Sequence, residues 1–248
     1  MGEGRIRIGC AGWTLPADLQ QVFPEGDSHL QRYAQVFAAS EINSSFHRPH
    51  RPSTYERWAA SVPPGFAFSA KLPKTITHVA RLAHPGPALD TFLAEAAGLG
   101  QRLNCLLVQL PPSLAFDAGT ATAFFAALRE RYAGPVALEP RHASWFTPDV
   151  DAWLAQQRVA RVLADPVRHA GGERPGGWPG LVYLRLHGSP RVYYSSYEPA
   201  VLEALASRIR AAAREGAEVW CIFDNTAGQA AAGNALALQR LLGQTNGG

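Results

Sequence analysis

The sequence is poor in cysteine and lacks long apolar runs, and both shortages exclude classes of protein. Three cysteines occur in 248 residues, with no CxxC pair, so neither a disulfide scaffold nor a paired-cysteine metal site is indicated. No segment reaches the ~20 apolar residues of a membrane-spanning helix, and the first residues lack a signal-peptide apolar stretch. We therefore expect a cytoplasmic protein without membrane contact, with Cys10, Cys105 and Cys221 as buried thiols.

Charged residues are also few, at 17% against 47% hydrophobic residues, which suits one large core. The formal net charge of +3 is too small to argue for bulk nucleic-acid binding. It is compatible with a small anionic ligand held by a few local Arg and Lys side chains. No repeat, low-complexity linker or dinucleotide glycine fingerprint occurs. The sequence therefore predicts one domain over residues 1–248, close to the ~250 residues typical of a TIM barrel.

Eight short apolar segments alternate with helix-like stretches along the chain, which indicates a parallel sheet. We predict a TIM-like (β/α)8 barrel, with an open doubly wound sheet as the alternative. Residues 167–180 hold five Gly and two Pro, so the sixth helix should be missing or reduced. In the helix predicted at 54–61, Ser53 and Glu56 should form a capping box. The predicted strands cover 5–10, a short segment ending in 41–46, 67–71, 105–110, 136–139, 160–164, 181–186 and 219–223; the other predicted helices cover 28–39, 87–99, 119–132, a stretch after 148, 199–214 and 230–242.

Side-chain alternation along the strands predicts which residues face the barrel interior. In the strand at 181–186, Val182, Leu184 and Leu186 share the apolar side, so Tyr183, Arg185 and His187 should point inward. After 219–223 the rule is ambiguous, because Asp224 and Asn225 both follow the last apolar residue. The same parity turns these polar residues toward the carboxyl-end mouth of the barrel: Glu41, Asn43, Lys71, Gln109, Glu139 and Arg141.

Charged side chains concentrated at the carboxyl ends of barrel strands predict a ligand or catalytic site, since active sites of this fold lie there. The alternative is an ion-pair network that plugs the mouth. His187 is the first candidate for acid–base chemistry, because its ordinary pKa lies near neutrality; Glu41 and Glu139 follow. We expect no cofactor and no metal, since Lys and Arg crowd the mouth and HxH, HExxH and DxD spacings are absent. The predicted substrate-binding residues are Lys71, Arg141, Arg185, Asn43, Gln109, His142, Asp224 and Asn225.

Seven ordered motifs extend over nearly the whole chain: GCAGW at 9–13, EINSSF at 41–46, KLP at 71–73 with ITH at 76–78, QLPPS at 109–113, EPRHASW at 139–145, RLHG at 185–188, and FDN at 223–225 with Gly228 and Asn234-Ala235. In these motifs the chain resembles the domain-of-unknown-function family 72, also called YecE-like. The resemblance implies a TIM barrel and brings no established reaction. Cys10 and Ala11 replace two hydroxyl residues usual in the family, while His47 replaces a Tyr and Asp224 an Asn.

Together these observations favour a metal-independent enzyme that acts by acid–base chemistry on a small polar or phosphorylated, sugar-like anion. Isomerase, lyase and hydrolase are not distinguished, and the oligomeric state is not predicted. A non-catalytic metabolite-binding protein is one alternative. Another is a nucleic-acid-binding or nucleic-acid-processing barrel, based on basic residues expected to be exposed and on loop aromatics that could stack on bases: Arg48, Arg51, Arg168, Arg174 and Arg191.

Overall fold

A barrel-like sheet of ten strands forms the centre of the structure, a computed structural model that describes residues 2–244. All pairings between barrel strands are parallel, and β8 alone pairs antiparallel, with β6. The α/β barrel predicted from the alternating pattern is thus confirmed. In sheet order the strands are β7 (Leu163–Asp165), β9 (Leu181–Leu186), β10 (Glu218–Phe223), β1 (Ile6–Ala11), β2 (Ala39–Ile42), β3 (Ala67–Lys71), β4 (Leu103–Gln109), β5 (Val136–Glu139), β6 (Val159–Arg161) and β8 (Gly176–Gly177).

The sixth barrel strand is divided, and its two parts nearly close the barrel. The strand predicted at 160–164 is kinked at Val162, so that β6 pairs with β5 and β7 pairs with β9. Val162 still donates its N–H to Leu138 O at 2.8 Å. From Leu163 onward the chain changes neighbour and lies beside Leu184. The kink therefore lets one strand connect the two edges of the sheet.

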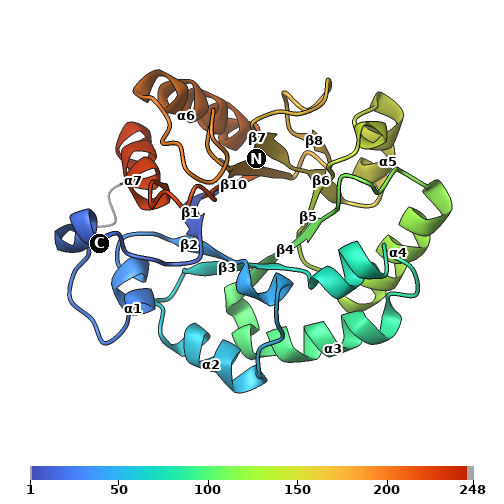
Figure 1. The fold of residues 1–248 in the computed structure, drawn as a ribbon, viewed down its shortest axis with the longest axis horizontal. Coiled ribbons are helices and arrows are strands. Elements are labelled where there is room, and N and C mark those ends of the chain that lie inside the picture. Colours follow the sequence, from blue (N-terminus) through green and yellow to red (C-terminus); the bar gives the residue numbers. More distant parts are fainter. Residues whose placement is uncertain (1, 245–248) are drawn as a thin grey trace.

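The helices form an outer ring around the strands (Figure 1). Between β7 and β9 the chain forms turns and the short β8, and no α-helix is described in residues 166–180. None of the helices in residues 2–244 is both long and apolar enough to cross a membrane. The α-helices are α1 (His29–Ala34), α2 (Pro52–Ala60), α3 (Gly86–Ala96), α4 (Ala118–Arg131), α5 (Pro148–Gln156), α6 (Pro199–Arg214) and α7 (Ala231–Leu242); shorter helical turns are η1 (Ala17–Val22), η2 (Ser44–Phe46), η3 (Thr75–Val79), η4 (Ala97–Arg102) and η5 (Ala143–Trp145).

Helix boundaries differ from the predicted ones where another constraint is stronger. α1 ends at Ala34, because Ala39 already belongs to β2. The capping box predicted at Ser53 and Glu56 is wrong: α2 begins at Pro52, and no side chain caps it. Proline suits the first helical position, since its fixed φ is helical and it has no N–H to satisfy.

The core has two layers, which confirm the predicted strand parity. Leu184 and Leu186 pack in the layer between strands and helices, whereas Tyr183 lies inside the barrel. All three cysteines are buried and free, as predicted, and burial raises the pKa of the Cys10 thiol to about 12. The buried hydrophobic residues inside the barrel are Ala39, Ala67, Cys105, Leu107, Ala137, Ala160, Val162, Leu181, Tyr183, Trp220 and Ile222.

Gly9 lies where β1 approaches β2 closely, so we expect that a larger residue at this position destabilises the fold. A Cβ at Gly9 would lie 2.0 Å from Ala39 O. Overpacking usually costs 1–3 kcal/mol, and here the neighbour is backbone, so we expect Gly9→Ala to lower the free energy of unfolding by at least about 3 kcal/mol. Gly119→Ala is the control: it is exposed in α4, and its Cβ would meet no atom nearer than 3.6 Å. It should be neutral or stabilising. Urea unfolding of both variants measures the difference, and equal stabilities would contradict this account.

Candidate functional site

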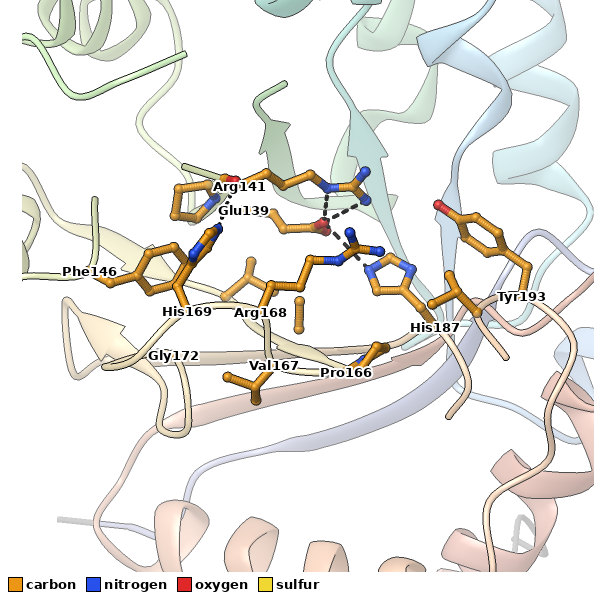
Figure 2. A pocket seen from close by; sticks show the side chains of 14 residues that line it. Glu139, Arg141, Phe146, Pro166, Val167, Arg168, His169, Gly172, His187 and Tyr193 are labelled. Carbon is orange, nitrogen blue, oxygen red and sulfur yellow. Dashed lines mark hydrogen bonds and ion pairs between the residues drawn. The ribbon is translucent and has the colours of Figure 1, made fainter. Parts of the chain in front are cut away.

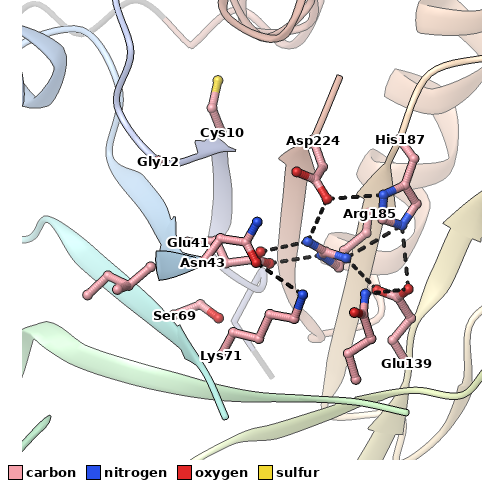
Figure 3. Close-up of polar contacts among 12 residues, drawn as sticks. Cys10, Gly12, Glu41, Asn43, Ser69, Lys71, Glu139, Arg185, His187 and Asp224 are labelled. Atoms are coloured by element: carbon pink, nitrogen blue, oxygen red, sulfur yellow. Dashed lines mark hydrogen bonds and ion pairs between the residues drawn. The ribbon is translucent and has the colours of Figure 1, made fainter. Parts of the chain in front are cut away.

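Arg185 lies at the centre of the barrel mouth and is completely buried. Its Nε and Nη2 donate to the two carboxylate oxygens of Glu41 at 3.0 and 2.7 Å. Nη1 donates to Glu139 Oε2 at 2.6 Å, and Nη2 also donates to Asp224 Oδ2 at 2.8 Å. Figure 3 shows these carboxylates converging on the guanidinium from β2, β5 and the end of β10. We call Arg185 with Glu41, Glu139 and Asp224 the arginine network.

Neighbouring donors complete the arginine network. Glu139 Oε1 accepts hydrogen bonds from Gln109 Nε2 and Arg141 Nε, each at 2.9 Å. The Tyr183 hydroxyl lies 2.9 Å from both Glu41 Oε2 and Ser69 Oγ. A buried charge is costly unless it is paired and hydrogen bonded. The predicted mouth residues therefore satisfy one another, as the ion-pair alternative required, but the network does not fill the mouth.

His187 lies at the edge of the arginine network, between two of its carboxylates. Its Nδ1 is 3.1 Å from Asp224 Oδ2, and its Nε2 is 3.5 Å from Glu139 Oε1. Burial disfavours the imidazolium, but Glu139 and Asp224 outweigh that effect and raise the pKa of His187. Burial likewise opposes ionisation of Glu139 and Asp224, yet Arg185 and His187 hold the pKa of both carboxyls below the ordinary value. The site therefore favours an imidazolium beside two carboxylates.

Lys71 ends β3 and points into the same mouth. Its Nζ donates to Asn43 Oδ1 at 3.0 Å and lies 4.1 Å from the centre of the Phe46 ring. Burial, followed by repulsion from Arg185, lowers the pKa of Lys71 to about 8. The uncharged amine is therefore more populated in Lys71 at neutral to slightly alkaline pH than in an ordinary lysine.

A cavity of about 80 Å³ opens beside His187, at the carboxyl ends of β5, β7 and β9. Arg141, Arg168, His169 and Tyr193 line it together with His187, and Phe146 forms part of an apolar wall (Figure 2). Since each enclosed water needs about 10–15 Å³ by this measure, the cavity suits a group of a few heavy atoms. It combines cationic and apolar surfaces in one small space.

A second hollow lies at the carboxyl ends of β1 and β2 and has a volume of about 380 Å³. Gly12, Trp13, His29, Asn43 and Ser44 are among its lining residues. Trp13 is fixed edge-on against Trp58, with ring centres 5.0 Å apart. Asn43 thus contacts both this hollow and Lys71.

The tertiary structure resolves the ambiguous end of the eighth barrel strand. Asp224 joins the arginine network, whereas Asn225 Nδ2 donates to Ser195 O at 2.9 Å and Asn234 Oδ1 at 2.8 Å, beside α7. His142 also lies outside the network: its Nδ1 accepts the Ser144 N–H and so caps η5. Both residues orient loops around the mouth, and a ligand contact for either remains a prediction.

Three polar residues of the cavity lining were not among the predicted site residues. Arg168 and His169 lie in the Gly- and Pro-rich segment after β7, where neither helical nor strand periodicity indicates side-chain direction. Tyr193 has a left-handed φ of +70°, rare for a bulky residue and typical of constrained functional loops. Its N–H donates to His187 O, and its carbonyl accepts the Gly228 N–H. A tyrosine-rich loop directly after a strand that ends in Arg-Leu-His was the available signal.

The mouth offers poor metal ligands, because each carboxylate of the arginine network is already ion-paired with Arg185. Across residues 2–244, no group of three or more His, Cys, Asp or Glu side chains is placed to hold a metal ion.

The fold and the mouth define the class of the protein: a parallel α/β barrel whose candidate site lies at the carboxyl ends of its strands. Residues 7–248 match the sequence model of the family described as "Protein of unknown function DUF72". The chain therefore belongs to the DUF72 family, as its motifs indicated. Membership of this family brings no particular reaction or substrate.

Relatives and a solved structure agree with this assignment. UPF0759 protein YunF of Bacillus subtilis strain 168 is 23% identical over 275 residues, covering 96% of this chain and 94% of YunF. UPF0759 protein YecE of Escherichia coli strain K12 is 30% identical over 106 residues, covering 43% of this chain and only 38% of YecE. The 2.52 Å crystal structure of a DUF72 family protein, EF0366 of Enterococcus faecalis V583, gives a TM-score of 0.78 at 22% identity, over 98% of this chain and 99% of that one. The similarity to the EF0366 structure supports the barrel fold of this chain.

Removing Arg185 should invert the pH dependence of stability. In the wild type, the lowered pKa values of Glu139 and Asp224 add stability above the ordinary carboxyl range, which is lost on acidification. Arg185→Met leaves buried carboxylates uncompensated, so we expect a loss of about 3–5 kcal/mol or more at pH 7. Part of that loss should be regained near pH 5, where uncompensated buried carboxyls take up protons.

Urea unfolding between pH 5 and pH 8 tests this expectation. The control is Arg131→Met, which breaks an exposed pair with Asp90 and should change stability little, because solvent screens such a pair. An Arg185→Met variant that is as stable as this control at pH 7 would show that the network is not a structural requirement.

Proposed function

We infer that the mouth is the active site of an enzyme that binds a small anion in the cavity beside His187 and uses this histidine as a general acid. The cationic lining of the cavity carries the inference. Arg141 and Arg168 supply guanidinium groups, and the raised pKa of His187 favours a third positive charge. Planar guanidinium groups suit bidentate binding of a carboxylate or phosphate.

The geometry supports different roles for the predicted site residues. Arg185 is fully buried, and its N–H groups donate to Glu41, Glu139 and Asp224, so it positions the site and does not hold the ligand. Glu41 is equally buried and shares that positioning role. Arg141 retains 27% side-chain exposure and lines the cavity. Glu139 lines it too, as an ionised hydrogen-bond acceptor that keeps His187 oriented.

The chemistry that suits this arrangement is proton donation to an anionic substrate. An imidazolium near the substrate can protonate a developing oxyanion or a leaving oxygen. The Asp224 and Glu139 carboxylates stabilise that imidazolium, and the apolar wall that includes Phe146 limits water. A phosphorylated or carboxylated, sugar-like compound fits this lining. Arg185 remains outside the reaction and holds the three carboxylates in place.

Anion binding should depend on Arg141. We expect inorganic phosphate or a phosphorylated sugar to stabilise the wild type, by roughly 2.7 kcal/mol at 100 times its dissociation constant. Arg141→Gln should remove most of this gain, whereas Arg131→Gln, an exposed change on α4, should keep it. Thermal unfolding with and without each anion is the measurement. Equal stabilisation of both variants would refute the assignment, and binding confined to oligonucleotides with steep salt dependence would favour the nucleic-acid alternative.

The raised pKa of His187 should be directly measurable by titration of its imidazole ring. Because its folded pKa exceeds the unfolded value near 6.5, its stabilising contribution is complete below that value and is lost as pH rises through the folded pKa. Ring-proton NMR should place the midpoint above 6.5 in the wild type and lower in Asp224→Asn. His187→Asn, the control, should lack this part of the pH-dependent loss of stability. A wild-type midpoint at or below 6.5 would contradict the general-acid role.

A further inference from the structure

Lys71 differs from Arg141 and Arg185 because no carboxylate pairs with it. Arg141 and Arg185 each contact Glu139 directly, yet no ion pair to Lys71 exists within 4.0 Å among residues 2–244. Its Nζ is bound by the neutral Asn43 Oδ1 and covered by the Phe46 ring. Only 5% of the residue is exposed. A lysine kept only as a structural charge would lose hydration here without a directly paired counter-ion, since Glu41, Glu139 and Asp224 act on it only from a longer distance.

The composition of the chain makes a lysine at this position unusual. Of its 23 basic residues, only Lys71 and Lys74 are lysine, and the rest are arginine. Arginine would hold an amide oxygen or an aromatic face at least as well. What arginine lacks is a primary amine that can lose its proton and form a carbon–nitrogen bond. A lysine at the end of β3, inside the mouth, therefore suits a chemical role better than an electrostatic one.

We propose that Lys71 is an imine-forming residue and that the substrate of this mouth carries an aldehyde or ketone as well as an anionic group. The inference deepens the proposed function and rests on the mouth being the ligand site. The hollow lined by Trp13 and Asn43 would hold the carbonyl end, since Asn43 lines that space and its Oδ1 accepts the hydrogen bond from Nζ. Figure 3 shows Nζ of Lys71 directed toward Asn43 and the arginine network.

The reaction balances without any oxidant or metal. The unprotonated Nζ adds to the carbonyl carbon and the carbon–oxygen π bond opens; the oxygen then takes one proton and the positively charged nitrogen releases one, which gives a neutral carbinolamine. Protonation of the hydroxyl then expels one water while the nitrogen lone pair forms the carbon–nitrogen double bond, leaving a protonated imine. Burial and a neighbouring cation are the two conditions that activate lysine amines, and both act on Lys71, from its enclosure and from Arg185.

Reductive trapping on the folded wild-type chain tests the proposal. The probes are glyceraldehyde and glyceraldehyde 3-phosphate at pH 7.5 with cyanoborohydride, followed by peptide mapping. An amine with a pKa of about 8 is about one-quarter unprotonated at this pH, against about one in a thousand for an ordinary lysine amine. Allowing for lower intrinsic reactivity and restricted access, we expect at least tenfold more adduct on Lys71 than on Lys74, which is exposed.

Two controls distinguish a specific reactivity of Lys71 from the general reactivity of lysine amines. The urea-denatured chain should label Lys71 and Lys74 equally, since both then face water. Lys74→Arg should keep the preferred adduct in the folded chain, and Lys71→Arg should abolish it. Equal labelling of the two lysines in the folded wild type, or a preference for Lys74, overturns the proposal without depending on the folding of any variant.

The paired probes distinguish this proposal from the anion site on which it rests. Preferred labelling of Lys71 by both aldehydes, with no advantage for the phosphorylated one, supports the imine and counts against the anion site. An advantage for glyceraldehyde 3-phosphate that disappears in Arg141→Gln supports both. If phosphate stabilises the chain but neither aldehyde prefers Lys71, the anion site stands and the imine role is wrong.

Discussion

The mouth of this barrel depends on one interaction: a guanidinium without access to water, held by three carboxylates from different parts of the sheet. Arg185 extends from β9 and contacts Glu41 at β2, Glu139 at β5 and Asp224 beyond β10. Each pair is favourable only while the others persist, because any unpaired member would be a buried charge. The network therefore links distant strands and sets the positions of the side chains around it.

The same charges give the two titratable groups beside the network opposite tendencies. His187 faces Asp224 and Glu139, which favour its protonated form. Lys71 faces Asn43 and Phe46 instead, and burial together with the nearby Arg185 favours its neutral form. One mouth can thus present an acid and an amine at the same pH. Divergent environments for paired titratable groups are a recurrent basis of catalysis, and here Glu139 and Asp224 raise the pKa of His187, whereas burial and then Arg185 lower that of Lys71.

Periodicity in the sequence was informative wherever one side of a strand is apolar. In 181–186 it separated Leu184 and Leu186 from Tyr183 and Arg185, and the two core layers have that division. Periodicity gave no information where polar and apolar residues do not alternate. After Phe223 two polar residues follow, and only the register of β10 on β9 turns Asp224 inward and Asn225 toward Asn234. In the segment after β7, Arg168 and His169 have no periodic neighbours, so their approach to the cavity was not predictable.

The sequence by itself determined the alternation of strands and helices, the family, and the concentration of charge at one end of the barrel, because these follow from local patterns and motifs. The tertiary structure alone decided which charged side chains are saturated by internal partners and which line a cavity where a ligand could bind. Arg185 and Arg141 look equivalent in the chain, yet one is saturated by three carboxylates and the other lines a cavity. Solvation and pairing depend on residues more than a hundred positions apart, such as Glu41 and Arg185, and no local pattern specifies them.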